Sequence, residues 1–176
     1  MKNILITIAL VAFTAIGFSQ KIDSKKSYIE FEIDNMIFRT VEGKISGMTG
    51  TVNFNETDLS NSSFNVCLDP ASIDTESEER DTHLKNSDFF DISKYTKLCF
   101  VSTSITKGGS NYLVKGKLTM YDTTAGAEIK FKVVGNQLIG EMEVNRFDFN
   151  LGVAEYDGTS MCGDIATIKV VCVLVK

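Results

Sequence analysis

The stretch "YIEFEID" (residues 28–34) alternates apolar and acidic side chains. Successive side chains of a β-strand point to opposite faces, so Ile29, Phe31 and Ile33 share one face and the acidic residues between them share the other. Such a pattern is typical of a half-buried strand. We therefore predict a strand that packs one face on a core and turns the other face to water.

The same period-two pattern recurs along the chain. It is found in "GTVNFN", "SSFNVCLD", "KLCFVSTSI", "NYLVKGKLTMYD", "AEIKFKVVG", "QLIGEMEVNRFDF" and "DIATIKVVCVLVK". Turn-forming residues lie between these segments, at positions 47–50, 61–63, 108–110, 123–126 and 135–136. Strands repeated every 8–12 residues or so are typical of an antiparallel barrel or sandwich. We predict an all-β fold of about eight strands, closed or sandwiched so that the apolar faces and most strand edges are covered.

The first 19 residues have the pattern of a cleaved signal peptide. Lys2 precedes a run at 4–13 that is apolar apart from Thr7, and Gly17 and Ser19 are small residues at the spacing of a signal-peptidase site. The run is shorter than the roughly 20 residues that span a bilayer, so we expect no membrane-spanning segment. We expect residues 20–176 to form a single domain that is exported to the periplasm or secreted.

The charge of the chain argues against nucleic acid as a partner. The net charge of the full sequence is −5, and removing Lys2 with the leader takes it to −6. Phosphate backbones are bound by clusters of basic side chains, and no such cluster stands out in this sequence.

Four cysteines remain after the predicted cleavage site: Cys67, Cys99, Cys162 and Cys172. An oxidising compartment permits disulfides, and four thiols allow three full pairings. If strands at 64–69 and 97–104 pair antiparallel, Cys67 and Cys99 can lie opposite each other and form a disulfide. Cys172 is expected to be a small buried apolar residue.

The stretch "IDTESEERDTHLKNSDFFD" (residues 73–91) departs from the strand pattern. Thr75 and Glu78 have the spacing of a capping box, in which a hydroxyl and a carboxylate satisfy free amides at a helix start. We predict a short helical segment near residues 75–92.

That segment holds the only histidine, His83, close to Asp81 and Ser87. A hydrolase triad would need these three groups to converge, but the sequence has no G-x-S-x-G elbow, and a single His–Asp pair is not specific. One histidine with scattered carboxylates does not match a zinc site either. We expect no catalytic residues and no metal, and we expect Arg80, Asp81 and His83 to anchor the segment through local hydrogen bonds.

Several motifs run in one order across nearly the whole mature chain. They are "SYIEFEI", "VEGKISGMTGTVNF", "ASIDT", "RDTHLKNSDFFD", "KYTKLCFVSTSI", "VKGKLTMYDTT" and "NRFDFNLG", of which "RDTHLKNSDFFD" (80–91) is the most specific. On these motifs the sequence resembles the YceI-like family of exported bacterial proteins. The resemblance implies a lipocalin-like β-barrel that binds a long apolar isoprenoid chain, such as a polyprenyl chain or a quinone tail, with no reaction and no required cofactor.

The resemblance also implies a tunnel of inward-facing apolar residues. Its expected wall is Phe31, Ile33, Phe38, Phe54, Phe64, Val66, Phe89, Phe90, Phe100, Leu118, Met120, Phe131, Met142, Phe147 and Phe149. The expected rim or lid residues at one end are Arg80, Asp81, His83, Leu84 and Arg146.

Alternation in "NRFDFN" (145–150) predicts that Arg146 and Asp148 lie on the opposite face from Phe147 and Phe149. Arg146 and Asp148 would then be solvated or form a cross-strand ion pair, and Arg146 near the mouth could meet a polar head group. The alternative function is a non-catalytic structural or interaction barrel with a filled core, which would act through its surface or as a homodimer.

Overall fold

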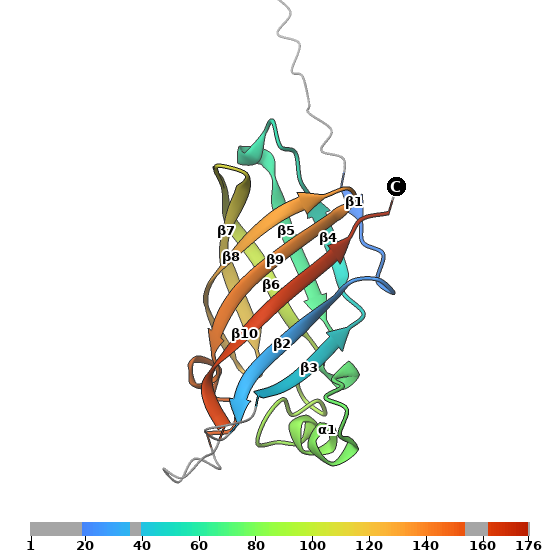
Figure 1. The fold of residues 1–176 in the computed structure, drawn as a ribbon, viewed down its shortest axis with the longest axis vertical. Coiled ribbons are helices and arrows are strands. Elements are labelled where there is room, and N and C mark those ends of the chain that lie inside the picture. Colours follow the sequence, from blue (N-terminus) through green and yellow to red (C-terminus); the bar gives the residue numbers. More distant parts are fainter. Residues whose placement is uncertain (1–18, 36–39, 154–161, 176) are drawn as a thin grey trace, which may run out of the picture.

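The structure is a computed structural model, and it describes residues 19–35, 40–153 and 162–175. Within these ranges a single antiparallel sheet has the strand order β1-β4-β5-β6-β7-β8-β9-β10-β2-β3 (Figure 1). The strands are β1 (Gln20–Lys21), β2 (Tyr28–Asn35), β3 (Thr40–Ser46), β4 (Thr49–Asn53), β5 (Ser63–Leu68), β6 (Leu98–Gly108), β7 (Asn111–Met120), β8 (Thr123–Val134), β9 (Gln137–Asn145) and β10 (Cys162–Val173). The helices are η1 (Leu59–Asn61), η2 (Pro70–Ser72), α1 (Glu78–Lys85) and η3 (Arg146–Phe149).

The sheet curls until its edge strands meet other parts of the chain. Beyond β1, Ile22 pairs with Leu174, which follows β10. On the other edge, Lys44 of β3 pairs with Asp74, and the two backbone N–O distances are 2.8 and 3.0 Å. The result is a curled half-barrel in which each edge is paired at one point with another part of the chain, and the prediction of an all-β antiparallel barrel with one short helix is confirmed.

The alternation pattern missed two of the ten strands. The first, β1, has only two residues, which is too short for a pattern. The second, β3, has Gly43 at the centre of its inward-facing row, so one apolar side chain of the row is missing there. The alternation of apolar and polar side chains does not detect a strand in which glycine replaces one of the apolar residues.

Two-residue loops join the central strands. Gly109 and Gly135 lie in the loops β6–β7 and β8–β9, with φ of 65° and 63°. The prediction of a turn at 123–126 is wrong: these residues begin β8, and the loop is at 121–122. Thr123 and Thr124 are β-branched and favour a strand, and the Oγ1 atom of Thr124 lies 2.8 Å from that of its cross-strand neighbour Thr119.

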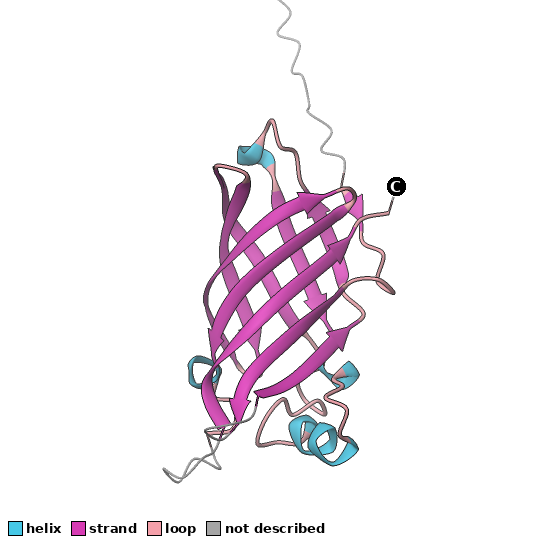
Figure 2. Ribbon diagram, in the orientation of Figure 1, coloured by secondary structure: helices cyan, strands magenta, loops and turns pink. Residues whose placement is uncertain are grey.

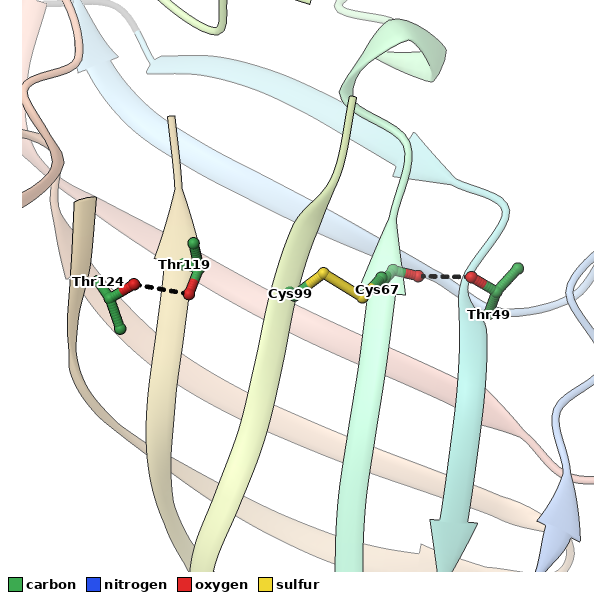
Figure 3. Close-up of a disulfide and its surroundings, with 5 residues drawn as sticks. All are labelled: Thr49, Cys67, Cys99, Thr119 and Thr124. Carbon is green, nitrogen blue, oxygen red and sulfur yellow. Dashed lines mark hydrogen bonds between the residues drawn. A yellow bond between two sulfur atoms is a disulfide. The ribbon is translucent and has the colours of Figure 1, made fainter. Parts of the chain in front are cut away.

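The disulfide joins the adjacent strands β5 and β6 (Figure 3). β5 and β6 pair so that Cys67 is directly opposite Cys99, and their sulfur atoms are bonded. The hydroxyl of Thr49 on β4 donates to the carbonyl of Cys67 at 3.4 Å. Of the other two cysteines, Cys172 is buried in the core and Cys162 is half-buried.

The helices α1, η2 and η3 gather at one end of the barrel, the lower end in Figure 2, while η1 and the C-terminal end lie at the other.

The helix α1 does not begin as the capping box predicts. Ser77 is its N-cap and accepts a hydrogen bond from the Arg80 amide, whereas Thr75 is buried and pairs with other side chains. Glu76 lies between Thr75 and the helix in the left-handed backbone conformation, with a φ of 61°, so the helix does not extend back to Thr75.

In the described ranges no helix is long and apolar enough to cross a membrane.

Candidate lipid-binding site

An apolar cavity of about 250 Å³ lies inside the barrel at the end covered by α1. Its wall combines strands from several parts of the sheet with residues 80–90. The residues that line it are Ile29, Phe31, Ile33, Val41, Ile45, Ile73, Arg80, His83, Leu84, Phe89, Phe90, Leu98, Met120, Val144, Arg146, Leu151, Cys162, Ala166 and Ile168. No carboxylate is among them, although the protein as a whole is acidic.

We call residues 75–92 the end segment, because they cover this end of the barrel. Leu84, Phe89 and Phe90 line the cavity and are half-buried, so the apolar side chains of the segment point into the barrel while α1 itself has no buried residue. The amide of Gly152 donates to the carbonyl of Asp88 at 2.8 Å. The end segment therefore contributes apolar side chains to one end of the cavity wall, and a backbone hydrogen bond ties it to the loop after η3.

Arg80 is fixed by hydrogen bonds within the end segment. Its Nε donates to the hydroxyl of Thr75 at 2.8 Å, and its Nη2 donates to the Thr75 carbonyl at 2.6 Å. Asp81 does not line the cavity; its carboxylate accepts from the amide and the hydroxyl of Thr75 at 2.9 and 2.6 Å. Asp81 thus positions Thr75, and Thr75 positions Arg80 beside the cavity.

The prediction that Arg146 is a solvated residue is wrong. Residues 146–149 form the 3-10 helix η3 rather than a strand, so alternation does not apply, and Arg146 is only 6% exposed. Its Nε donates to the carbonyl of Gly163 at 3.0 Å, and its Nη1 donates to those of Leu151 and Gly152 at 3.0 and 3.3 Å. A buried guanidinium that holds three carbonyls fixes the loop after η3 against the start of β10 and places a positive charge beside the cavity.

His83 and Phe89 form an edge-to-face pair in the end segment, with ring centroids 5.1 Å apart. A Cβ atom on Gly152 would lie 2.7 Å from the Phe89 ring and 3.1 Å from Nη1 of Arg146. The absence of a side chain at Gly152 therefore lets Phe89 pack close to Arg146. This places His83, Phe89 and Arg146 together at the covered end of the cavity.

Two smaller cavities continue along the barrel axis, with volumes of about 70 and 50 Å³. Beyond them the interior is filled by an aromatic cluster of Phe54, Phe64, Tyr112 and Phe131, whose ring centroids are 5.1–6.0 Å apart in the contacting pairs. The interior is therefore roomiest beneath the end segment, narrows along the axis, and is closed by aromatic rings at the far end.

A larger hollow of about 500 Å³ lies beside the cavity, between β3 and residues 74–80, and its wall is more polar than that of the cavity. It shares Phe31, Val41 and Arg80 with the apolar cavity, but five acidic residues stand in its wall: Glu30, Glu32, Glu42, Asp74 and Glu76. Carboxylates are costly to desolvate, so this hollow suits water rather than a hydrocarbon chain.

The structure brings most of the sequence-predicted apolar residues to the three cavities. Phe31, Ile33, Phe89, Phe90 and Met120 line the largest, while Phe64, Val66, Phe100, Leu118, Met120, Phe131 and Met142 line the smaller ones. Phe54, Phe147 and Phe149 do not line any of these three: Phe54 belongs to the aromatic cluster, and Phe147 and Phe149 lie on η3, where Phe147 stacks on the Arg146 guanidinium. Phe38 lies outside the described residues.

Other wall residues were not predicted. Ile29 and Ile168 alternate along their strands with outward-facing residues, so the sequence pattern could have identified them as inward-facing. Leu151 and Cys162 had no such signal, because Leu151 lies in an irregular loop and Cys162 begins a strand at a register shift.

Comparison with known proteins places this arrangement in a family. Residues 20–174 match the family described as the YceI-like domain. A UPF0312 protein from Serratia proteamaculans is 33% identical over 128 residues, which make up 72% of this chain and 67% of that relative. Among solved structures, Burkholderia cenocepacia BcnA has a TM-score of 0.79 at 26% identity, with 88% of this chain and 99% of BcnA covered.

A polyisoprenoid binding domain from Saccharophagus degradans shares the fold, with a TM-score of 0.66 at 10% identity over 88% of this chain and 96% of that domain. The family match extends over nearly all of the described barrel, from β1 to the residue after β10. This chain therefore belongs to the YceI-like family.

Proposed function

We propose that this protein binds the long apolar tail of an isoprenoid-type lipid, a polyprenyl chain or a quinone tail, and carries or sequesters it inside the barrel without catalysing a reaction. The observation that carries the proposal is the cavity of about 250 Å³ beneath the end segment, whose wall is almost entirely apolar. The fold shared with the polyisoprenoid binding domain of Saccharophagus degradans supports the same class of ligand.

The size of the cavity sets the scale of binding. A water molecule takes about 30 Å³ in the liquid, and a methylene group is of comparable size, so 250 Å³ holds about eight carbon-sized groups. Burying about eight methylenes at roughly 0.8 kcal/mol each contributes about 6 kcal/mol. Because association costs about 4–15 kcal/mol, a tail confined to this cavity binds weakly, and tight binding requires the tail to reach further along the axis.

The two ends of the barrel give the ligand a direction. The far end is closed by the aromatic cluster, whereas the α1 end is covered by the end segment and carries Arg80, His83 and Arg146 in the cavity wall. The tail therefore points toward the aromatic cluster, and the polar head stays at the α1 end. Basic side chains there favour a head group that accepts hydrogen bonds.

The location that fits this function is the periplasm. The leader-like sequence at residues 1–19 supports export, although it lies outside the described residues except for Ser19. The disulfide between Cys67 and Cys99 supports an oxidising compartment. There, a carrier for isoprenoid lipids would shield their tails from water.

The test is to extract the purified protein with organic solvent and identify bound lipids by mass spectrometry. We expect an isoprenoid lipid or quinone from the unaltered protein. Two neighbouring variants on β10 provide the comparison: Ala166 lines the cavity, while Thr167 is exposed.

Ala166→Phe should fill the cavity and abolish the bound lipid, and Thr167→Phe should leave it unchanged. Circular dichroism of both variants checks that the barrel is intact. An extract of the unaltered protein that contains no lipid would favour a filled barrel acting through its surface.

A further inference from the structure

The three cavities are separated by two rings of side chains that the neighbouring cavities share. The cavities of about 250 and 70 Å³ share Ile29, Leu98, Met120 and Ile168. These residues lie on β2, β6, β7 and β10, and the first and last of these strands face β6 and β7 across the barrel (Figure 1). The four side chains therefore surround the interior where the two cavities adjoin, and we call them the first ring.

A second ring lies further along the axis. The cavities of about 70 and 50 Å³ share Met48, Val66, Phe100, Ile129 and Val170. These residues come from β5, β6, β8, β10 and the turn between β3 and β4, so they also surround the interior.

Each ring contains one methionine among stiffer side chains. Isoleucine and valine are branched at Cβ and are largely restricted to one χ1 rotamer. Phe100 is held flat against β7, because its ring lies where a Cβ on Gly116 would be. Methionine is unbranched, has three rotatable side-chain bonds and adapts to irregular spaces. Leu98, the remaining member of the first ring, has fewer rotatable side-chain bonds than methionine. Met120 and Met48 are therefore the most adaptable members of the two rings.

We propose that Met120 and Met48 act as two gates in series that determine how long a tail the barrel accepts. This inference rests on the proposed function and concerns the length of the tail. With both gates in the positions described here, the barrel accepts about eight carbons. Rotation of Met120 adds the second cavity and rotation of Met48 adds the third, each with room for about two more carbons.

The gates predict a break in the dependence of affinity on chain length. Each methylene that enters the first cavity should raise affinity about fourfold. Beyond about eight carbons the gain per methylene should fall, because the next group must displace the Met120 side chain from its packed position.

Isothermal titration calorimetry with straight-chain carboxylates of about 4 to about 16 carbons, which lie on both sides of the expected length, measures this break. The protein is first stripped of co-purified lipid. In Met120→Ala the break should move to longer chains by about two carbons, so that chains just past the break bind roughly tenfold more tightly than to the unaltered protein. Met120→Val is a second variant with a strand-forming side chain, and it should move the break in the same direction.

Leu118→Ala is the matched control, since Leu118 lines the 70 Å³ cavity but not the first ring. It enlarges the space behind the gate without opening the gate, so the break should stay where it is. A break that lies at the same length in the unaltered protein, Met120→Ala and Met120→Val would overturn the gate proposal while leaving lipid binding intact. If carboxylates of every length fail to bind the unaltered protein, both the gate and the proposed function are wrong.

Discussion

The ring of Phe31 lies over Gly43, its partner across the β2–β3 pair. A Cβ atom at position 43 would overlap the outer carbons of the ring and lie 2.9 Å from Cγ2 of Thr75. Phe31 lines the apolar cavity, so the glycine sets the shape of one cavity wall through the ring above it.

Gly43→Ala should therefore destabilise the barrel and weaken lipid binding. Overpacking of this kind typically costs about 1–3 kcal/mol of unfolding free energy. Chemical denaturation measures the change, and Gly126→Ala on β8 is the control, because a Cβ there meets nothing within 4 Å. The prediction is wrong if the two glycine variants are equally stable.

Arg146→Met should destabilise the protein by about 2–4 kcal/mol, since buried acceptors left without a donor are costly. The carbonyls of Leu151, Gly152 and Gly163 lose their donor, while the methionine keeps much of the apolar stem. The measurement is thermal denaturation. Lys169→Met, which removes an exposed cation paired with Glu30, should change stability far less.

Removing the disulfide with Cys67→Ser and Cys99→Ser should lower the unfolding free energy by about 3–4 kcal/mol, because the bond closes a loop with a sequence separation of 32 residues. Denaturant melts with and without a reducing agent give the value. The reducing agent should lower the midpoint of the unaltered protein and leave that of the double variant in place. A reductant effect of equal size in both would show that the stabilisation comes from elsewhere.

The carboxylate of Asp91 anchors the end of the segment that covers the cavity. It accepts a hydrogen bond from the Ser93 hydroxyl at 2.6 Å and lies 2.9 Å from Nζ of Lys94. The Ser93 hydrogen bond and then Lys94 lower the pKa of Asp91 below its ordinary value of 3.8. Because the folded-state pKa is lowered, this stabilisation is present at pH values well above 3.8 and is lost as the pH falls through the lowered pKa.

Asp91→Asn should therefore reduce the melting temperature at neutral pH, and the difference from the unaltered protein should shrink as the pH approaches 3 or below. Melting curves across this range test the prediction. Asp122→Asn, in the exposed β7–β8 loop, should show no comparable difference. A constant gap between Asp91→Asn and the unaltered protein at every pH would contradict the prediction.

Cys162 can report on ligand occupancy, because it lines the cavity. Burial raises the pKa of its thiol, with the positive charge of Arg146 opposing the shift, and burial raises the pKa of Cys172 to about 11. Both thiols are therefore protonated at neutral pH and should alkylate slowly, with buried Cys172 the slower of the two.

A bound lipid should slow the labelling of Cys162 further, as measured by mass spectrometry after timed exposure to iodoacetamide. Cys162→Ser should remove the ligand-dependent labelling. Equal labelling rates with and without lipid would show that the tail does not occupy the cavity next to Cys162.

Local patterns in the sequence were sufficient for the class of fold. Ile29, Phe31 and Ile33 alternate with acids, and the pairing of β2 with β3 and β10 follows that phase over most of its length. The same reasoning failed at residues 146–149, where alternation predicts a strand and the chain forms η3. The side chain of Asn145 accepts a hydrogen bond from the Phe147 amide, which starts a turn that competes with the strand.

The site was only partly predictable for a related reason. Strand phase identifies which side chains point inward, and it indicated Phe31, Phe100 and Met120. The alternation within a strand does not distinguish an inward side chain that borders a cavity from one that fills the interior. Phe54 and Met120 therefore could not be told apart on sequence, although Phe54 packs in the aromatic cluster.

The sequence alone was enough to predict an all-β chain with one apolar face per strand and a short helical segment near residues 75–92, and it allowed a disulfide between Cys67 and Cys99 without fixing the strand register that the bond requires. The packing of the folded chain was needed to show where the interior is hollow, which side chains neighbouring cavities share, and that Arg146 is buried beside the cavity. The reason is that alternation is a property of each strand alone. A cavity depends on how side chains from strands far apart in the sequence fill the same cross-section of the barrel.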